Sequence, residues 1–383
     1  SSLNNLNYLK DTVMFSKFIP SKSSADFKSA FEEVTLSANT ILILACDDNQ
    51  YRKQDIDPIL QQCDKKVLGG IFPQIIYQNQ KYSQGAILLG LDEDLDVSLI
   101  ENISNKSDFS QIIEDKIGEL SEETSTMFVF VDGLSQNIAP IIDRLFDNYG
   151  LAINYIGGGA GSLSFEQNPV IFSNQGLLED CAIFAKSTLR SGIGVKHGWK
   201  SISDTYKVTR ADKNTIYELD YQDAFDVYKK VVEKASQKRF TDSNFFDISK
   251  SYPFGINKLS GEMVVRDPIV LQDKALICVG EVPENTFVNI LEGEKSSLIS
   301  AAKEAYDESI DSLESDVKTF TLFIDCISRV LFLEDAFDDE IQAVYDKEST
   351  LVGALTLGEI ANNKRHYLEF YNKTAVIAKI ENG

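Results

Sequence analysis

The sequence predicts a mixed α/β protein of the α+β kind, in which two related lobes carry largely antiparallel or mixed sheets flanked by helices. Three observations lead to this prediction. A unit that reads strand, helix, strand and hairpin recurs about three times in the 383 residues. Apolar runs of strand length alternate with segments whose apolar residues recur at helical spacing. The chain is also longer than a typical domain that is built around one hydrophobic core, so we expect two domains.

Each copy of the repeated unit opens on an apolar run that ends in small or acidic residues. These runs read ILILACDD, FVFVDGLS and LFIDCISR, and they begin at Ile41, Phe128 and Leu322. An amphipathic segment follows, then VLGG, YIGGG or LVGA, and finally two apolar stretches joined by a turn. Duplicated units meet at pseudo-symmetric interfaces, where clefts tend to lie. We place the three units at residues 40–91, 127–186 and 319–380.

The other elements follow from local patterns. The amphipathic segment 138–146 opens after Ser135 and Gln136 and stops at Gly150, which indicates a helix with a capped start and a glycine end. Between residues 295 and 315, apolar residues recur at helical spacing and leave an acidic outer face. Further elements are expected as a strand at 12–18, helices at 25–36 and 109–120, a strand passing into a helix at 215–232, and strands at 261–265, 275–279 and 285–291.

The polar segment 235–250 is the best candidate for a linker between domains. We therefore expect a first domain over residues 1–234, which holds the first two repeated units. The second domain then covers residues 235–383 and holds the third unit.

Charge and composition exclude several classes of partner. The formal net charge of -22 opposes binding to phosphate backbones and anionic lipid surfaces, so we expect no nucleic-acid partner. No apolar run approaches the roughly 20 residues that span a bilayer, and the first residues lack a basic segment followed by an apolar one. We therefore expect no membrane insertion.

The cysteine and histidine content indicates a reducing compartment and no metal. Five scattered cysteines without a CxxC pair fit a cytoplasmic protein better than a disulfide framework or a zinc site. The chain has two histidines, too few for a histidine-rich metal centre. We expect neither a metal nor a cofactor.

The glycine cluster IGGGAGS at residues 156–162 has two readings that stay open. A nucleotide loop needs GK[ST], or GxGxxG followed by a helix, but Ser162 stands at the sixth position and a hairpin follows. Gly157, Gly158 and Gly159 either allow tight packing of a strand or let the backbone approach a small ligand.

Cys326 is a candidate nucleophile because we expect it at the end of a strand, three residues before Arg329. A nearby guanidinium lowers the pKa of a thiol and so raises its thiolate fraction. A cysteine enzyme also needs a base, and the candidates are His197 and His366. The alternative is a small, buried, inert cysteine, and we assign no catalytic residue.

Several other residues could bind a ligand or simply pack. His197 lies beside Trp199, the single tryptophan, and the two either contact a ligand or fix a domain junction. Glu359 is a carboxylate in an apolar strand, which is costly unless it is paired or functional. Arg266 or Arg329 together with Glu359 would match the two charged ends of an amino acid.

The ordered set of motifs resembles one family. VDGLS, IGGGAGS and KHGWKSIS with YKVTRADKNTIYELDYQDAFDVY resemble the N-terminal FIST domain. YPFGI, GEMVVRDPIV, LICVGEVPENTFVNIL, DCISR and GALTLGEIA with FYNKTAV resemble the C-terminal FIST domain. The name stands for F-box and intracellular signal transduction. The resemblance extends from about residue 35 to the end and keeps the order of the family's motifs.

This resemblance implies a stand-alone bacterial sensory protein, since the chain carries no kinase, cyclase or F-box segment. The family is regarded as a sensory module that binds small ligands such as amino acids. Transferred by motif position, the ligand-binding residues are expected to be Gly157, Gly158, Gly159, His197, Trp199, Arg266, Cys326, Arg329 and Glu359.

We therefore expect a cytoplasmic signal-transduction sensor that binds a small ligand, such as an amino acid or a derivative, between its lobes. The ligand would act through its different affinities for open and closed lobes, and a signalling protein would receive the change. One alternative is an enzyme that uses Cys326 as its nucleophile. Another is a scaffold whose acidic surface docks a basic partner without any ligand.

Overall fold

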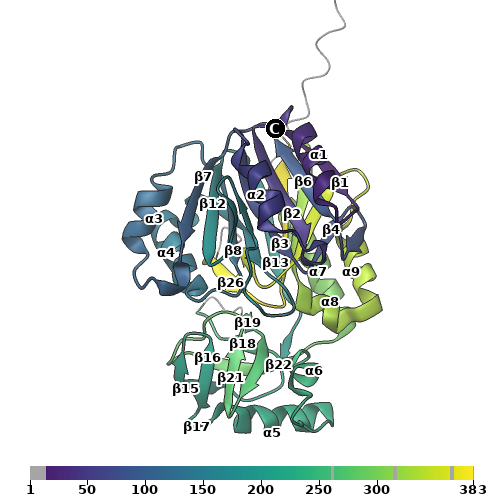
Figure 1. Ribbon diagram of the computed structural model, residues 1–383. Helices are drawn as coiled ribbons and strands as arrows, with labels where there is room; N and C mark the ends of the chain where they lie inside the picture. Colours follow the sequence, from purple (N-terminus) through teal and green to yellow (C-terminus); the bar gives the residue numbers. More distant parts are fainter. Residues whose placement is uncertain (1–13, 260–262, 314–316, 363–365, 383) are drawn as a thin grey trace, which may run out of the picture.

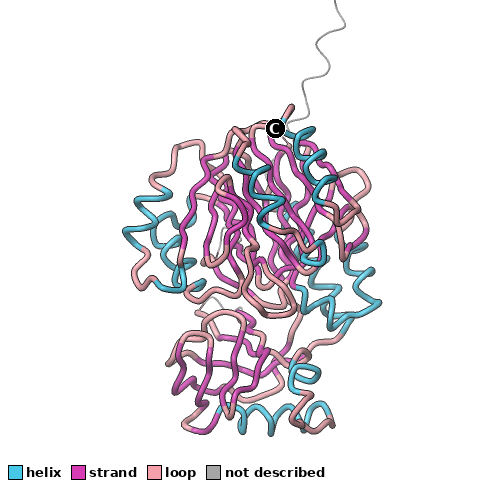
Figure 2. The backbone as a smooth tube through the Cα atoms, in the orientation of Figure 1, coloured by secondary structure: helices cyan, strands magenta, loops and turns pink. Residues whose placement is uncertain are grey.

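The computed structural model describes residues 14–259, 263–313, 317–362 and 366–382. Residues 12, 13, 261, 262, 314 and 315, at the ends of three predicted elements, lie outside this range. The chain forms a large body and a smaller inserted domain, residues 200–292, which lies below the body in Figure 1. Figure 2 shows strands filling the body while helices lie on its outside. The predicted mixed α+β class is confirmed.

The three repeated units share one plan. In each unit the first strand pairs in parallel with the second and antiparallel with the last. The first unit contains β2 (Thr40–Cys46), α2 (Lys53–Gln61), β3 (Lys66–Phe72), β4 (Gln74–Tyr77), β5 (Gln80–Tyr82) and β6 (Ala86–Leu91). The second contains β8 (Thr126–Asp132), α4 (Ile138–Tyr149), β9 (Asn154–Ala160), β10 (Ile171–Ser173), β11 (Gly176–Leu178) and β12 (Cys181–Ser187). The third contains β23 (Thr319–Cys326), α8 (Ile327–Leu333), α9 (Phe337–Val344), β24 (Leu351–Thr356), β25 (Glu359–Ala361), β26 (Glu369–Tyr371) and β27 (Ala375–Glu381).

A further strand and helix precede each unit and belong to the same repeat. The strand pairs antiparallel with the last strand of the unit that follows it, which extends each sheet by one edge strand. These pairs are β1 (Met14–Ile19) with α1 (Ser24–Thr35), β7 (Asp96–Glu101) with α3 (Ser110–Ile117), and β13 (Ser191–Lys196) with α7 (Lys295–Asp311). In the third repeat the inserted domain separates the strand from the helix.

The hairpin of each unit leaves its own sheet and completes the sheet of another unit. The β4–β5 hairpin of the first unit pairs with β24 of the third. The β10–β11 hairpin of the second pairs with β3 of the first, and the β25–β26 hairpin of the third pairs with β9 of the second. The described residues thus form three equivalent six-stranded sheets that are linked in a ring by exchanged hairpins.

A glycine at one equivalent position allows the paired parallel strands to pack. A Cβ atom at these positions would lie only 1.6 to 2.2 Å from a carbonyl oxygen of the neighbouring strand, so no other residue fits. The glycine and the residue that carries this oxygen are Gly69 with Ile43, Gly157 with Val129, and Gly353 with Phe323. The repetition of this contact shows that the three units are structural copies.

The helix starts illustrate local and distant capping. Ser23 caps α1, because its hydroxyl accepts a hydrogen bond from the backbone N–H of Asp26 at 3.2 Å. The helix predicted at 138–146 is α4, which continues to Tyr149. Its Ala139 N–H donates to Glu281 of the inserted domain at 2.9 Å, so a distant carboxylate satisfies this end of the helix.

The inserted domain carries one continuous sheet of short strands against two helices. Its strands are β14 (Lys200–Ser201), β15 (Tyr206–Asp212), β16 (Thr215–Leu219), β17 (Gln222–Asp223), β18 (Phe254–Ile256), β19 (Val264–Arg266), β20 (Pro268–Gln272), β21 (Ala275–Cys278) and β22 (Phe287–Glu292). Its helices are α5 (Ala224–Ser236) and α6 (Phe245–Ser249), and α6 lies within the segment that we predicted as a linker. The domain boundary at residues 234 and 235 stays a prediction.

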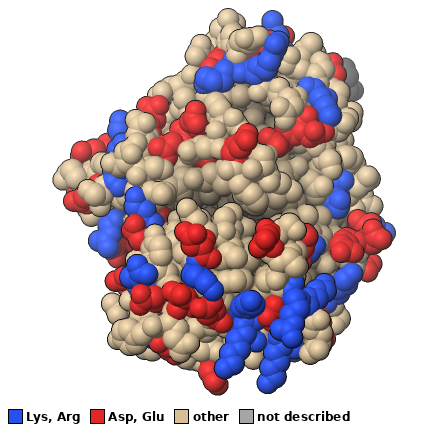
Figure 3. Space-filling model, turned by 60° about the horizontal axis from the view of Figure 1, so that its bottom comes forward, with Lys and Arg blue, Asp and Glu red and all other residues tan. Residues whose placement is uncertain are grey.

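Charge is unevenly spread over the surface. Figure 3 shows Lys and Arg gathered on one part of the lower face. In the inserted domain, α5 exposes Lys229, Lys230 and Lys234. In the described part of the chain, no helix has both the length and the apolar content needed to cross a membrane.

Candidate functional site

The predicted site residues come together at the end of the third unit that faces the inserted domain. Cys326 ends β23, Arg329 lies in α8, and Glu359 begins β25. Glu359 is the ladder partner of Gly158 in β9, so the glycine cluster lies beside the same strand. The long-range pairing of the third unit with the second therefore assembles this region.

A small cavity, here called the junction cavity, lies where the second unit, the third unit and the inserted domain meet. Its volume is about 20 Å³, which is enough for a single water molecule. Its described lining residues are Leu163, Phe165, Phe246, Asp267, Ile269, Val279, Cys326, Ile327, Ser328, Leu331, Leu357, Gly358 and Asn372. Of the nine predicted site residues, Cys326 alone belongs to this described lining.

Two polar atoms of the cavity lining have no hydrogen-bond partner in the described structure. These are Oδ1 of Asp267 and Nδ2 of Asn372, and both side chains are buried. The other atoms of these residues are used, since the Asp267 N–H donates to Oδ1 of Asn372 at 2.7 Å. A buried polar group without a partner costs roughly 1–3 kcal/mol, so these two atoms mark a place for a polar ligand or water.

The Cys326 thiol is held in a neutral state. Its Sγ atom lies 3.0 Å from Oγ of Ser328. Burial raises the pKa of this thiol well above its usual value, and the Glu359 carboxyl raises it further. Cys326 can therefore offer a ligand a weak thiol hydrogen bond, whereas a thiolate nucleophile is disfavoured.

Glu359 is protonated at neutral pH. Burial raises the pKa of its carboxyl to about 8, although hydrogen bonds with Thr356, Thr374 and Cys326 lower it. Oγ1 of Thr356 lies 2.8 Å from Oε2 of Glu359 and 3.2 Å from the carbonyl oxygen of Asp325. The Thr356 hydroxyl donates to Oε2 of Glu359, and this donation is one of the bonds that lower the pKa of the carboxyl.

Arg329 is engaged with protein groups rather than facing the cavity. Its side chain is fully buried, and its Nε donates to Glu340 at 2.9 Å. Its terminal nitrogens donate to Glu340 and to the carbonyl oxygens of His197, Lys373 and Leu298. The guanidinium therefore fixes the start of α8, and the structure supports a positioning role for it in place of the expected contact with a ligand carboxylate.

His197 and Trp199 lie where the chain leaves the body for the inserted domain. The Trp199 indole N–H donates to the carbonyl oxygen of Lys373 at 3.0 Å, and the Lys373 ammonium lies 5.1 Å from the ring centroid. The Trp199 backbone N–H donates to Nδ1 of His197 at 2.9 Å. Burial, followed by the charge of Arg329, lowers the pKa of His197 to about 4, so this imidazole is neutral. This geometry favours the reading in which the two residues fix a domain junction.

Arg266 and the glycine cluster lie outside the described lining of the junction cavity. The Arg266 guanidinium is buried, donates to the carbonyl oxygen of Glu281 at 3.0 Å and also bonds to that of Phe370. A Cβ at Gly158 or Gly159 would lie 2.8 or 2.2 Å from a backbone oxygen. The structure thus favours tight strand packing for the glycines.

Asp267, Asn372, Ser328 and Lys373 were missed by the sequence reasoning. All four lie inside motifs that carry the family resemblance, namely GEMVVRDPIV, FYNKTAV and DCISR. Lys373 is buried and pairs with Asp267 at 3.5 Å. Burial raises the pKa of Asp267 to about 6, while Lys373 lowers it, so Asp267 is mostly ionised at pH 7. The buried ion pair between Asp267 and Lys373 is the feature that marks this region. The sequence does not reveal it, because the two residues are more than 100 positions apart.

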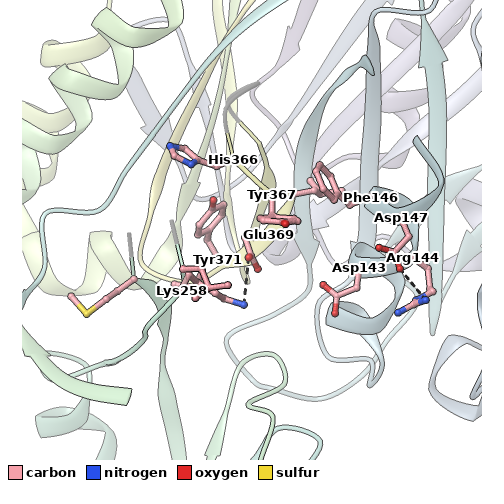
Figure 4. Close-up of a pocket in the computed structure, with 13 residues that line it drawn as sticks. Asp143, Arg144, Phe146, Asp147, Lys258, His366, Tyr367, Glu369 and Tyr371 are labelled. Atoms are coloured by element: carbon pink, nitrogen blue, oxygen red, sulfur yellow. Dashed lines mark ion pairs between the residues drawn. The ribbon is translucent and has the colours of Figure 1, made fainter. Parts of the chain in front are cut away.

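A second hollow, here called the α4 cleft, is shown in Figure 4. Its described lining comes from α4, from residues 258, 259, 263 and 264, and from residues 366–369 and 371. Its volume is about 400 Å³, within the size range of small-molecule sites. Its described lining includes none of the nine predicted residues. Within the described ranges, no group of three His, Cys, Asp or Glu side chains could hold a metal ion.

The architecture is that of a repeat-built α/β module with an inserted β domain and a small, mostly apolar cavity at their junction. Models of the FIST N domain and the FIST C domain match residues 40–222 and 224–362. No curated protein matches the chain. The chain belongs to the FIST family, whose domains are known as sensory domains of signal transduction. The predicted family resemblance is confirmed.

Proposed function

We propose that this protein is a cytoplasmic sensor whose input is a small polar ligand, an amino acid or a derivative, bound at the junction cavity. The observation that carries the proposal is that two residues which line the cavity, Asp267 and Asn372, each have a buried polar atom without a hydrogen-bond partner in the described structure, Oδ1 and Nδ2. An ammonium group would donate to Asp267. A carboxylate would accept from Asn372 and from the Ser328 hydroxyl, so the two ends of an amino acid match both atoms.

In this proposal the other predicted residues support the ligand indirectly. Cys326 contacts the ligand as a neutral thiol, and Glu359 holds Cys326 and Thr356 in place. Arg329, His197 and Trp199 fix the junction around Lys373. Arg266, Gly157, Gly158 and Gly159 support the strands beside the cavity without lining it.

Ligand binding would require the inserted domain to move. Small-molecule sites usually have about 300–1,000 Å³, far more than the closed junction cavity offers. The contacts that cross the junction include the Asp267 N–H with Oδ1 of Asn372, the Asn372 N–H with the carbonyl oxygen of Val265 at 3.1 Å, and the Asp267–Lys373 ion pair. A ligand that binds the open form more tightly would shift the population toward it, and a signalling protein would read the new position.

The thiol chemistry favours this proposal over an enzyme. A nucleophilic cysteine needs a lowered pKa or an adjacent base, whereas burial raises the pKa of Cys326. The neighbouring carboxyl of Glu359 is protonated at neutral pH and so cannot act as that base.

Titration calorimetry of the whole chain with a panel of free amino acids tests the proposal. We expect saturable binding of one class, and a loss of about tenfold or more in Asp267→Asn, since a charge-assisted hydrogen bond is removed. Ser328→Ala should weaken the same ligand more mildly. Asp242→Asn, an exposed change in the same domain, is the matched control.

Hydrogen exchange then tests the proposed movement. The bound ligand should speed exchange of the Asn372 and Asp267 amides, whose acceptors lie across the junction. Equal affinity in wild type and Asp267→Asn would contradict the site. If no amino acid of the panel gives saturable binding, the alternative of a ligand-free scaffold is supported.

A further inference from the structure

We propose that the junction cavity selects an amino acid whose side chain is large and apolar, of the size of leucine or phenylalanine. This specificity rests on the proposed function, since it concerns the side chain of the same ligand. It follows from the distribution of polar and apolar residues along the described lining, and from an aromatic pair that crosses the junction.

Polar and apolar residues of the cavity differ in their exposure. The polar lining residues Asp267, Ser328 and Asn372 are all buried. The partly exposed residues of the described lining are all apolar, and they are Leu163, Phe165, Phe246, Ile269, Val279 and Leu331. Polar residues normally lie nearer to the solvent, so this reversed order marks a place where an apolar group is received.

This order also sets the direction of a bound amino acid. In the proposed function, the charged ends of the ligand meet Asp267 and Asn372, which are buried. The side chain then lies along the apolar remainder of the lining, toward Leu163, which is 39% exposed. A large apolar side chain loses contact with water there, which is favourable. A polar side chain would lose its water without gaining a hydrogen-bond partner.

An aromatic pair crosses the junction at this apolar part of the cavity. Phe165 lies between β9 and β10 of the body, whereas Phe246 lies in α6 of the inserted domain. Their ring centroids are 6.3 Å apart at an interplanar angle of 83°, an edge-to-face contact. In Figure 1, α6 lies just below α8 of the third unit. Movement of the inserted domain would separate the two rings, and an apolar side chain of the ligand would then pack between them.

The backbone of Phe165 is held in a costly conformation. Its φ angle is 56°, in the left-handed region that aromatic residues rarely adopt. The Phe165 N–H donates to the carbonyl oxygen of Ser162 at 3.1 Å, and the Ser162 hydroxyl donates to Oδ2 of Asp47 at 2.7 Å. On the other side, the Gln167 amide donates to Oδ2 of Asp132 at 2.8 Å. Such conformations persist where the surroundings impose them, and they cluster at ligand-binding sites.

Titration calorimetry of the whole chain with leucine, glutamine and glycine tests the specificity. Leucine and glutamine are similar in size but differ in polarity, and glycine has no side chain. We expect leucine to bind at least about tenfold more tightly than either of the others, because its side chain is buried among apolar groups. Equal affinities for leucine and glutamine, or tighter binding of glutamine, would overturn the proposal.

The same titrations separate this specificity from the proposed function. If the three amino acids bind equally well and Asp267→Asn weakens all of them, the proposed function stands and the apolar specificity is wrong. If none of the three, and no other free amino acid, gives saturable binding, both are wrong.

Variants of Phe246 test the aromatic pair. Phe246→Ala should weaken leucine binding about tenfold, and Phe246→Leu should restore most of the affinity, because an apolar surface is kept. Phe287→Ala is the matched control in the same domain. Its ring is 50% exposed and lies outside the described lining of the cavity, so leucine affinity should change by about twofold at most. Equal losses in Phe246→Ala and Phe287→Ala would overturn the proposal.

A second variant avoids dependence on the fold of Phe246→Ala. Leu163 is partly exposed, so Leu163→Asp should fold, and thermal unfolding verifies this for each variant. The new carboxylate would face the apolar side chain and should weaken leucine binding about tenfold. Wild-type affinity for leucine in a folded Leu163→Asp variant would also overturn the proposal.

Discussion

Replacing Glu359 by glutamine should stabilise the protein by an amount that grows with pH. The pKa of the Glu359 carboxyl is about 8 in the folded state, against an ordinary value of 4.5. The native state therefore keeps a proton that the unfolded chain loses above pH 4.5. Because the unfolded state then binds fewer protons, the free energy of unfolding falls as pH rises from 4.5 to 8.

The magnitude follows from the pKa difference. Each pH unit in this window is equivalent to about 1.4 kcal/mol. Relative to pH 4.5, ionisation of this one group therefore lowers the free energy of unfolding of the wild-type protein by roughly 3 kcal/mol at pH 7 and by roughly 5 kcal/mol above pH 8. Glutamine cannot ionise, and its amide oxygen can accept from Thr356 as the carboxyl does. The Glu359→Gln variant should therefore not show this loss of stability.

Urea unfolding of both proteins, followed by circular dichroism at several values between pH 5 and 9, measures the effect. The difference in free energy of unfolding should be below about 1 kcal/mol at pH 5 and reach about 5 kcal/mol near pH 9. Ionisable groups that do not interact with Glu359 contribute equally in both proteins, so they cancel from the difference. Glu359→Ala, which also loses the hydrogen bonds, is the contrasting control. A difference that stays constant with pH, or a glutamine variant less stable at pH 8, would refute the reasoning.

Three further outcomes are expected. Gly157→Ala should prevent folding, because its Cβ would lie 1.6 Å from the carbonyl oxygen of Val129. Gly150→Ala, whose Cβ would have open space around it, should lower the free energy of unfolding by only about 1–2 kcal/mol, as measured by thermal unfolding. Similar losses of stability in the two variants would contradict the packing argument. Arg329→Met should lower the free energy of unfolding by about 3–5 kcal/mol, because Glu340 is left as an unpaired buried charge. In a urea titration, the double variant with Glu340→Leu should recover part of this loss. If the losses of the two substitutions simply add, the pairing is contradicted. Iodoacetamide at pH 7.5 should alkylate the half-buried Cys63 well before the buried Cys326, and peptide mass spectrometry would show the order. Faster alkylation of Cys326 would support the hypothesis that it is a nucleophile.

Local patterns carried most of the fold prediction. The three repeated units, the α+β class and the helices α1, α4 and α7 were predicted because apolar periodicity is a property of neighbouring residues. The exchanged hairpins and the inserted domain were not predicted, because they depend on pairings between distant segments. The cap that Glu281 provides to α4 is one such case, since the two lie 142 positions apart.

The site prediction was limited by the same separation. The sequence singled out Cys326, Glu359 and Arg329, and the structure does bring them together. It could not show whether the Arg329 guanidinium faces a ligand or the protein, because its partner Glu340 lies in an acidic run that reads as surface. Asp267 and Asn372 become a pair only when the inserted domain folds back against the third unit.

The ring of exchanged hairpins has a consequence for how the chain is made. During synthesis, the sheet of the first unit can be completed once the second unit has left the ribosome. The sheet of the second unit must wait for β25 and β26, so the edge of β9 stays open until nearly the whole chain has been translated. An open edge is a template for wrong pairing. A nascent chain that stalls after the FIST N domain would therefore expose this edge to other nascent chains, and timely release of the last residues protects the protein from aggregation.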